Sequence, residues 1–435
     1  MLNIKQKEAI CAYQNGKNIF ITGCAGTGKS YVLKEIIQYI KHDRKTYAIT
    51  ASTGCAAVLI NGQTIHSYLG IGICNYTIEK VISNLKKNRT KYEQLQQLQV
   101  LIIDEISMID DISFEYISKL LKKIKDNDKP FGGVQTILVG DFCQLSPVQG
   151  DYCFQCDTWG KLNLEYIYLT EIVRQKDDEE LKQILQEVRF ANCSRATINK
   201  LSKLQNNVLN EDIKPAKLFA LRADVDAVNK IAFEKLYLST HKKFCEDARK
   251  ISCNPIIMHT EYDIELLTAT DYNSEKDIFR YNAYTNDKKT DTKEYIIELF
   301  KGLQVMVTRN INFEKGLING TIGIICNLTP TSVCIKSNKI YHMVYYHKDL
   351  NENNNTYIKF MPLKLAYAIS IHKSQGATLD AVEIDASSLI FAQGQLYTAL
   401  SRVRSIENIK LINFDKDSIM CNADVKDFYK NLKCT

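Results

Sequence analysis

Short runs of apolar residues, each followed by a polar turn, form the strongest pattern in the first third of the chain. They occupy residues 19–21, residues 100–103 and the start of the segment 135–147. Continuous apolar runs of this kind are typical of parallel strands covered on both faces. After the first run, apolar residues recur at helical spacing, at Val32, Leu33, Ile36, Ile37 and Ile40. The pattern predicts parallel strands, with an amphipathic helix after the first one.

The same periodicities predict the remaining elements. Residues 70–96 carry apolar side chains at helical spacing, which indicates a small helical insertion containing Ile78, Val81, Ile82 and Leu85. Strands of a second parallel sheet are expected at 216–221, 381–384 and 409–414. From Gly302 onward, short strands separated by Asn, Gly and Thr-Pro predict a small β-barrel over about residues 303–361. Residues 366–371 are expected to be helical, and residues 240–300 are polar and give no clear pattern.

Length and composition indicate a soluble protein of more than one domain. The 435 residues are 45% hydrophobic and 24% charged, and a chain this long is expected to form two or three domains. The net charge of +6 indicates only a mild preference for polyanionic partners. No apolar run approaches the roughly 18 residues of a membrane span, and no signal peptide is recognisable. We therefore expect an intracellular protein, cytoplasmic or nuclear and not secreted, with no membrane partner.

Cysteines and histidines offer possible metal ligands. Among the 14 cysteines, only Cys153 and Cys156 form a C-x-x-C pair, and no second pair or histidine follows nearby. Reduced core thiols are therefore favoured over a zinc site. His342, Tyr345 and His347 lie in the expected barrel, where ordinary barrel positions are favoured over ligands.

The turn after the first apolar run has the pattern of a phosphate loop. Residues 23–30 read G-x-x-x-x-G-K-S, between a predicted strand and a predicted helix, which is the context that such a loop requires. Backbone N–H groups of the loop and the helix N-terminus would surround the phosphates. The nucleotide-binding residues are therefore Gly23, Cys24, Ala25, Gly26, Thr27, Gly28, Lys29 and Ser30. Lys29 would reach the β- and γ-phosphates, and Ser30 would bind Mg²⁺.

Polar residues at the ends of the other two runs complete this chemistry. Asp104 would hold Mg²⁺ through water, and Glu105 is placed to polarise the attacking water, which predicts a hydrolase. Gln144, in the turn after the third run, could contact a γ-phosphate. Two strands with such ends, beside a phosphate loop, predict a nucleotide hydrolase of the RecA-like class.

Residues 46–72 contain small hydroxyls, glycines and the aromatic Tyr68 in a pattern suited to a nucleic-acid backbone. The candidates for contacts to DNA are Thr53, Gly54, His66, Ser67 and Tyr68. An ordinary polar loop with helix-capping residues explains the same pattern and, taken alone, is the preferred interpretation.

The chain resembles the PIF-type (petite integration frequency) DNA helicases of superfamily 1B. The resemblance runs from Leu2 to about Phe414 and includes, in the family's order, "LNIKQKEAI", "GCAGTGKS", "TASTGCAA", "GQTIHSY", "DEISM", "DKPFGG", "GDFCQLSP", "LTEIVRQ", "GLQVMVTRN", "LINGTIG", "AISIHKSQGATLD" and "LYTALSRVRS". Leu121 departs from the family, which usually has a small residue there.

The resemblance implies roles at matching positions. Gln6 would contact the adenine edge, and Arg174 and Arg402 would be arginine fingers on the γ-phosphate, a task that suits the fixed fork of a guanidinium. Gln375 and Gly376 would face the γ-phosphate. The remaining polar residues of this segment would lie toward DNA: His372, Lys373, Ser374 and Thr378.

The resemblance also implies an architecture and an activity. Two tandem RecA-like domains are expected at 1–175 and 176–435, with a wedge-like insertion at 70–96 and the accessory barrel in the second. The expected enzyme uses ATP and Mg²⁺, moves 5′ to 3′ on single-stranded DNA and unwinds duplex or forked DNA in replication, repair or recombination. It is expected to be a bare helicase core that acts as a monomer on DNA.

Two other interpretations remain. A phosphate-loop ATPase acting on a protein or small molecule explains residues 23–30 and Asp104, but gives His66, Lys373 and Arg402 no role. A DNA-binding scaffold without catalysis is opposed by the intact Lys29 and Glu105.

Overall fold

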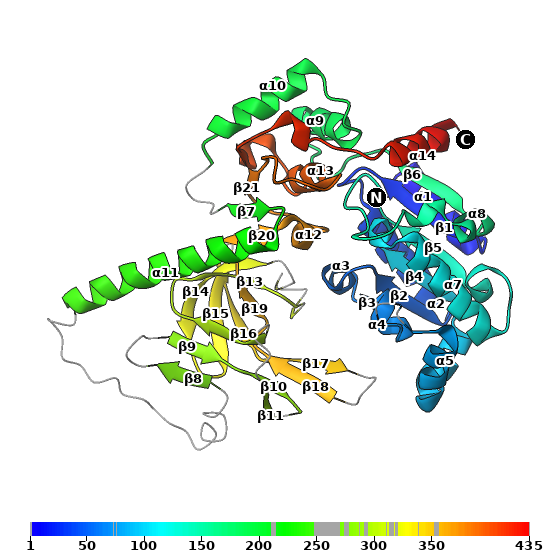
Figure 1. The fold of residues 1–435 in the computed structure, drawn as a ribbon, viewed down its shortest axis with the longest axis horizontal. Helices are drawn as coiled ribbons and strands as arrows, with labels where there is room; N and C mark the ends of the chain where they lie inside the picture. The colour runs from blue at the N-terminus through cyan, green and yellow to red at the C-terminus, as the bar shows by residue number, and fades with distance from the viewer. Residues whose placement is uncertain are drawn as a thin grey trace. The chain divides into compact units, whose positions relative to one another are not determined.

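The structure is a computed structural model that describes residues 2–72, 74, 76–209, 215–247, 270–273, 278–286, 288–290, 295–309, 311–312, 317, 321–337, 339–351 and 356–434. The chain divides into two compact units (Figure 1). The first unit contains residues 1–220 and 370–435, and the second contains residues 221–369. The expected boundary near residue 175 falls inside the first unit and stays a prediction.

A parallel sheet of six strands forms the centre of the first unit. Its order is β3-β2-β4-β5-β1-β6, with β1 (Ile19–Gly23), β2 (Tyr47–Ala51), β3 (Gln63–Thr64), β4 (Val100–Asp104), β5 (Gln135–Val139) and β6 (Glu165–Leu169). All neighbouring pairs are parallel, and the three strands predicted from apolar runs are confirmed. Because parallel strands end at one edge of the sheet, the turns after β1, β4 and β5 are brought to that edge.

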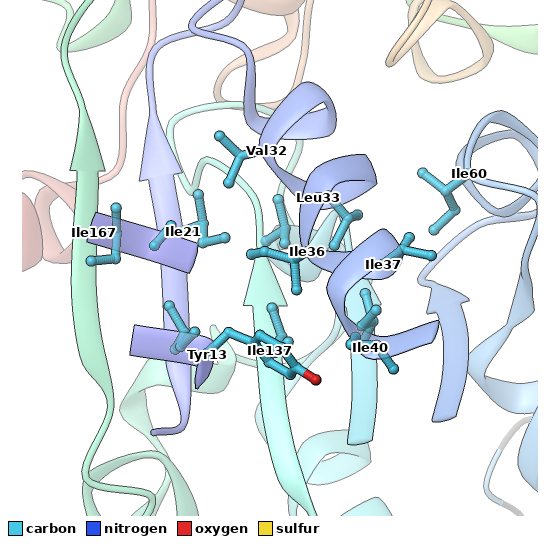
Figure 2. Close-up of a cluster of buried hydrophobic side chains, with 14 of the residues drawn as sticks. Tyr13, Ile21, Val32, Leu33, Ile36, Ile37, Ile40, Ile60, Ile137 and Ile167 are labelled. Carbon is cyan, nitrogen blue, oxygen red and sulfur yellow. The ribbon is translucent and has the colours of Figure 1, made fainter. Parts of the chain in front are cut away.

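The predicted helix after the first strand is α2 (Lys29–His42), and it packs on this sheet. Figure 2 shows Val32, Leu33, Ile36, Ile37 and Ile40 pointing from α2 toward the strands. These five side chains are at most 8% exposed. Full burial of one such aliphatic side chain stabilises a fold by about 1.5–3 kcal/mol, so this face fixes the start of α2 relative to the end of β1.

The first unit also contains further helices. They are α1 (Ile4–Gln14), α3 (Gly54–Leu59), α4 (Ile65–Leu69), α7 (Asp111–Lys125), α8 (Asp157–Lys161), α9 (Glu179–Arg189), α10 (Arg195–Lys203), α13 (Gln395–Leu400) and α14 (Ala423–Cys434). Leu121, the departure from the family, is fully buried on α7.

The helical insertion predicted at 70–96 is confirmed as two short helices, α5 (Ile78–Lys87) and α6 (Arg89–Gln97). Val81 and Leu85 turn inward, with exposed fractions of 1% and 6%. Thr77 accepts a hydrogen bond from the N–H of Lys80 and so begins α5. Asn88 ends α5 and caps α6.

The three strands expected for a second parallel sheet are also present: β7 (Ala216–Phe219), β21 (Val382–Asp385) and β22 (Ile409–Ile412). β21 lies between the other two and is parallel to both. With the six-stranded sheet, the fold is α/β with two parallel sheets, as expected for tandem RecA-like domains.

The expectation of a helix over residues 366–371 is wrong. The chain there forms β20 (Ala368–Ser370), preceded by β19 (Leu363–Leu365), and the helix α12 (Ile371–Ser374) begins only within the polar run. Ala368, Ile369 and Ser370 are all buried in succession. An amphipathic helix would leave one face of such a segment exposed, whereas a strand of a sheet with both faces covered, even the edge strand β20, can bury successive residues.

The second unit contains the long helix α11 (Arg222–Asp247) and antiparallel strands. One sheet has the order β16-β15-β14-β13-β19 and consists of β13 (Gln304–Val307), β14 (Ile322–Leu328), β15 (Ser332–Ser337), β16 (Ile340–Tyr345) and β19. Another has the order β11-β10-β18-β17, with β10 (Ala283–Thr285), β11 (Lys288–Thr290), β17 (His347–Asn351) and β18 (Thr356–Phe360). A third contains β8 (Thr270–Asn273), β9 (Ile278–Tyr281) and β12 (Ile297–Leu299). Figure 1 shows α11 lying along these strands, and its Phe233, Leu236 and Tyr237 pack on their core.

The short strands predicted from Gly302 onward are therefore present, although β18 pairs in a different sheet from β13. Of the segment 240–300, which gave no clear pattern, residues 248–269 lie outside the described residues. His342 is buried, Tyr345 is exposed, and the Nε2 atom of His347 lies 3.2 Å from a carboxylate oxygen of Asp349.

Within the described residues, no group of three or more His, Cys, Asp or Glu side chains is arranged to hold a metal ion. Cys153 and Cys156 are free thiols, and the Cys156 thiol donates to the carbonyl oxygen of Cys153 at 3.1 Å. No helix among the described residues is long and apolar enough to cross a membrane.

Candidate functional site

The phosphate loop joins β1 to α2, and its glycines are required by its shape. Gly26 and Gly28 have φ angles of 83° and 85°, a region that only glycine adopts without strain. A Cβ atom at Gly26 would lie 2.7 Å from Oε1 of Gln175, and one at Gly28 would lie 2.9 Å from Nε2 of Gln6. The loop leads directly into the first turn of the 14-residue helix α2, so its N–H groups and the helix N-terminus form an anion site.

Lys29 is the first residue of α2, and its side chain folds back over the loop. Its Nζ donates to the carbonyl oxygens of Gly23 at 2.9 Å and Cys24 at 3.0 Å. Burial lowers the pKa of Lys29, and the carboxylates of Asp141 and Glu105 oppose this effect. A cation whose hydrogen bonds go to two carbonyl oxygens of the loop is suited to a polyanionic ligand such as a triphosphate.

Asp104 and Glu105 follow β4 at the same edge of the sheet. Burial and the neighbouring Glu105 raise the pKa of Asp104 above its usual value. Oδ1 of Asp104 accepts a hydrogen bond of 2.9 Å from the N–H of Glu105, and the nearby Lys29 partly offsets the rise in the pKa of Asp104. Ser30, on the first turn of α2, is exposed. Its hydroxyl and the Asp104 carboxylate are the oxygen donors that Mg²⁺ prefers.

Glu105 has a left-handed backbone, with φ of 52° and ψ of 46°, which is uncommon for a residue other than glycine and typical of functional sites. Its Oε2 accepts a hydrogen bond of 2.9 Å from Nε2 of Gln375. Oε1 of Gln375 is buried and has no hydrogen-bond partner among the described residues. The structure thus brings together two predicted site residues that lie 270 positions apart.

Of the two predicted arginine fingers, Arg174 contacts the phosphate loop, and Arg402 lies near Arg174 and Glu105. The backbone N–H of Arg174 donates to the carbonyl oxygen of Gly26 at 3.1 Å, and its Nη1 donates to Ser401 at 2.9 Å. Arg402 is 2% exposed and donates to the carbonyl oxygen of Thr398 at 2.7 Å. Burial, together with the nearby Arg174, lowers the pKa of Arg402 to about 9. The carboxylate of Glu105 partly offsets this effect.

Gln6 lies beside the same loop, and Gln144 lies in the turn after β5. Gln6 is 4% exposed, and its Oε1 accepts from the N–H of Asn3 at 3.0 Å, while its Nε2 faces Gly28. Gln144 is also 4% exposed and lies in the turn after β5, where its N–H donates to the carbonyl oxygen of Asp141 at 2.9 Å.

Sequence reasoning missed a buried polar cluster around Asp141. Arg189, from α9, donates to both carboxylate oxygens of Asp141 at 2.8 and 3.2 Å. The hydroxyls of Tyr397 and Tyr429 donate to the same carboxylate at 3.3 and 3.1 Å. The only signal in the sequence was the acid that ends the "VGD" of the third strand, because its partners come from three distant helices.

The first group of predicted DNA contacts lies on α3 and α4. Thr53 accepts a hydrogen bond from the N–H of Ala56, so it also caps α3, as the alternative interpretation requires. Gly54 and Ser67 are exposed, and His66 and Tyr68 are half-buried. Nζ of Lys91 lies 4.0 Å from the centre of the Tyr68 ring, which adds a cation beside an aromatic face.

The second group lies on and after α12. His372 and Lys373 are half-buried and Thr378 is exposed. Ser374 is fully buried, and its hydroxyl donates to the carbonyl oxygen of Ile371 at 2.7 Å. Gly376, next to Gln375, has a φ of 76°. Only one residue therefore separates Lys373 from Gln375, the residue that contacts Glu105.

A phosphate loop whose lysine, carboxylates and two arginines meet at one edge of a parallel sheet defines the molecule as a phosphate-loop nucleoside triphosphatase. Comparison with known proteins resolves the class further. Residues 1–200 match the family model described as PIF1-like helicase, and residues 295–328 match the 2B domain of DNA helicase Pif1.

Relatives of known sequence agree over nearly the whole chain. An ATP-dependent DNA helicase Pif1 of Psychrobacter is 31% identical over 96% of this chain and 69% of its own length. The uncharacterised protein 030L of invertebrate iridescent virus 6 is 32% identical over 99% of this chain and 94% of its own length. The chain spans 64% of the length of the vertebrate PIF1 helicases that it matches. The chain belongs to the PIF1-like helicase family.

Solved structures show the same fold. The crystal structure of the Candida albicans Pif1 helicase is 29% identical, covers 99% of both chains and gives a TM-score of 0.80. A Bacteroides Pif1, crystallised with bound single-stranded DNA, is 26% identical and gives a TM-score of 0.68 over all of this chain.

Proposed function

We propose that this chain is an ATP-dependent DNA helicase that hydrolyses ATP at the phosphate loop and moves 5′ to 3′ on single-stranded DNA. The observation that carries the proposal is the hydrogen bond from Gln375 to Glu105. It joins the carboxylate beside the phosphate loop to the segment that contains His372 and Lys373. Coupling ATP hydrolysis to DNA requires a connection between the nucleotide site and a segment that can contact the polyanion. This hydrogen bond would be such a connection.

In hydrolysis, the loop N–H groups and Lys29 bind the phosphates, and Glu105 takes the proton of the attacking water. Arg174 and Arg402 stabilise charge on the γ-phosphoryl group. Gln144 would report whether the γ-phosphate is present, and Gln375 and Gly376 would face it. Gln6 contacts the adenine edge. Ser30 and Asp104 would hold Mg²⁺, which neutralises phosphate charge when it is bound.

DNA is gripped mainly through its phosphates, so binding depends on salt and little on sequence. Thr53, Gly54 and the three α4 residues His66, Ser67 and Tyr68 form one contact surface, and His372, Lys373 and Thr378 form another. The Bacteroides Pif1 bound to single-stranded DNA supports this assignment by its similarity over the whole chain. The buried Ser374 contributes by shaping α12.

The proposed domains are residues 1–175 and 176–435, with α5 and α6 as the wedge that separates the duplex and the strands within 303–361 as the accessory barrel. The match of residues 295–328 to a Pif1 2B domain supports the barrel. We expect one copy to act on forked DNA in replication, repair or recombination.

The test has two stages, with Lys29→Ala as the control for contaminating ATPase. First, phosphate release is measured with and without single-stranded DNA. Absence of stimulation would favour an ATPase with another partner, and absence of turnover would favour a scaffold without catalysis. Second, strand displacement is measured on matched duplexes that carry a 5′ or a 3′ single-stranded tail. Unwinding from the 5′ tail is expected, and unwinding only from the 3′ tail would overturn the assigned direction.

A further inference from the structure

The hydroxyl of Tyr397 makes a direct contact with the phosphate loop. It accepts a hydrogen bond of 2.8 Å from the backbone N–H of Ala25 and donates one of 3.3 Å to Oδ2 of Asp141. The side chain is 2% exposed. A phenylalanine would fill the same space, but it would leave a buried N–H without its acceptor. The hydroxyl therefore has a task that packing alone does not explain.

Tyr397 belongs to α13, the helix that leads to Arg402. The guanidinium of Arg402 is bonded to this helix through the carbonyl oxygen of Thr398. The carbonyl oxygen of Ser401, at the end of the same helix, accepts from Arg174. Both arginines are thus attached to α13, and the Tyr397 hydroxyl bonds that helix directly to the loop that binds phosphate.

The other partner of the hydroxyl is also fixed. Asp141 is fully buried, and Arg189 holds both of its oxygens. Tyr429 approaches Asp141 from α14 and bonds the hydroxyl of Thr22 on β1 at 2.7 Å. Asp141 is therefore a rigid acceptor, and the hydroxyl of Tyr397 has one allowed orientation: it donates to Asp141 and accepts from Ala25.

We propose that Tyr397 is a positioning residue for the hydrolytic step. It holds α13, and with it the attached Arg174 and Arg402, in a fixed position relative to the phosphate loop. The proposal rests on the proposed ATPase function. In this proposal the Tyr397 hydroxyl determines the placement of Arg402 and Arg174 relative to the phosphate, and the hydroxyl adds no contact to the nucleotide base or sugar. Loss of the hydroxyl should therefore lower kcat and leave KM for ATP nearly unchanged.

The test compares Tyr397→Phe with Tyr429→Phe. Both variants remove one hydroxyl from the same carboxylate of Asp141. The Tyr397 hydroxyl also accepts from Ala25 in the phosphate loop, whereas the Tyr429 hydroxyl accepts from the N–H of Phe142, in the turn after β5. For Tyr397→Phe we expect kcat in saturating DNA to fall about tenfold, which corresponds to the loss of one buried hydrogen bond, with KM for ATP within about twofold. For Tyr429→Phe we expect a similar loss of thermal stability with kcat within about twofold. Equal kcat for Tyr397→Phe and wild type, or equal losses in both variants, would overturn the proposal.

Hydrogen exchange on the wild-type protein provides a second measurement that does not depend on a variant that folds. In the nucleotide-free protein, the N–H of Ala25 should exchange about a hundredfold more slowly than an exposed amide, because the Tyr397 hydroxyl accepts it. Free exchange at Ala25 would show that the bond is absent and the proposal wrong. If the wild type does not hydrolyse ATP, the proposed function fails whatever the exchange shows. If it does and Tyr397→Phe matches it, only this inference fails.

Discussion

Replacing Arg189 with methionine removes the only cation that is hydrogen-bonded to Asp141 in the described part of the chain. Both side chains have no exposed surface, and two hydrogen bonds of 2.8 and 3.2 Å join them. The variant keeps most of the side-chain volume but leaves a carboxylate buried beside two tyrosine hydroxyls. Breaking a buried pair from one side typically costs about 3–5 kcal/mol, because the remaining charge has lost both its solvent and its partner.

The stability loss of the Arg189→Met variant should also change with pH, in a direction that follows from the pKa of Asp141. Burial raises the pKa of Asp141, but Arg189 and Lys29 outweigh that effect and hold the pKa below its usual value. In the wild type, the carboxylate therefore stabilises the fold above the unfolded pKa of about 3.9, and this stability is lost only as the pH falls through the lower folded pKa. Without Arg189, burial should raise the pKa, so the variant loses stability as the pH rises from about 4 toward 7. The deficit should thus be largest near neutral pH.

Urea unfolding followed by tryptophan fluorescence is a suitable assay. The chain has a single tryptophan, Trp159, and its ring centre lies 5.7 Å from that of Phe142, the residue after Asp141. With a urea slope of about 3 kcal/mol per molar, a loss of 3 kcal/mol lowers the midpoint by roughly 1 M. Because the probe is buried in the first unit, the transition reports the unit that contains the pair.

Three controls separate charge from packing. Arg189→Lys keeps the charge but loses the fork, and should cost about 1.5–3 kcal/mol. Lys200→Met removes an exposed partner of Glu180, and should cost at most about 1 kcal/mol. Adding Asp141→Asn to Arg189→Met removes the unpaired charge and should recover part of the loss. A cost below 1 kcal/mol for Arg189→Met, or a deficit that does not change with pH, would refute the reasoning.

Other positions test the site itself. Glu105→Gln should lower kcat about 100-fold or more without weakening the binding of a fluorescent ADP analogue; unchanged turnover would exclude Glu105 as the base. His372→Ala should reduce the ratio of ATPase rates with and without single-stranded DNA severalfold, and an unchanged ratio would remove it from the DNA contacts. Gly394→Ala should cost at least about 1–3 kcal/mol in the urea assay, because its φ is 76° and a Cβ would collide with carbonyl oxygens after β5. Gly160→Ala, with open space around it, should not.

Sequence was sufficient where the information is local. The phosphate loop and the strands ending at Asp104 and Val139 could be predicted because each combines an apolar run with a polar turn within a few residues. The cluster around Asp141 could not, because Arg189, Tyr397 and Tyr429 are 48, 256 and 288 positions away. The sequence around each of these three residues does not distinguish a hydrogen-bond partner of Asp141 from an ordinary helix residue.

The error at residues 366–371 has a related cause. The two alanines of this segment favour a helix when considered alone, but backbone pairing in the folded chain made residues 368–370 a strand and moved the start of the helix to Ile371. The displacement matters for function, because α12 now contains His372 and Lys373 and ends immediately before Gln375. A helix ending at Ile371 would have left these three residues on a free loop. A short helix instead fixes the distance between His372, Lys373 and the amide that contacts Glu105. Under the proposed function, a shift of α12 on DNA would therefore be transmitted to the Glu105 carboxylate.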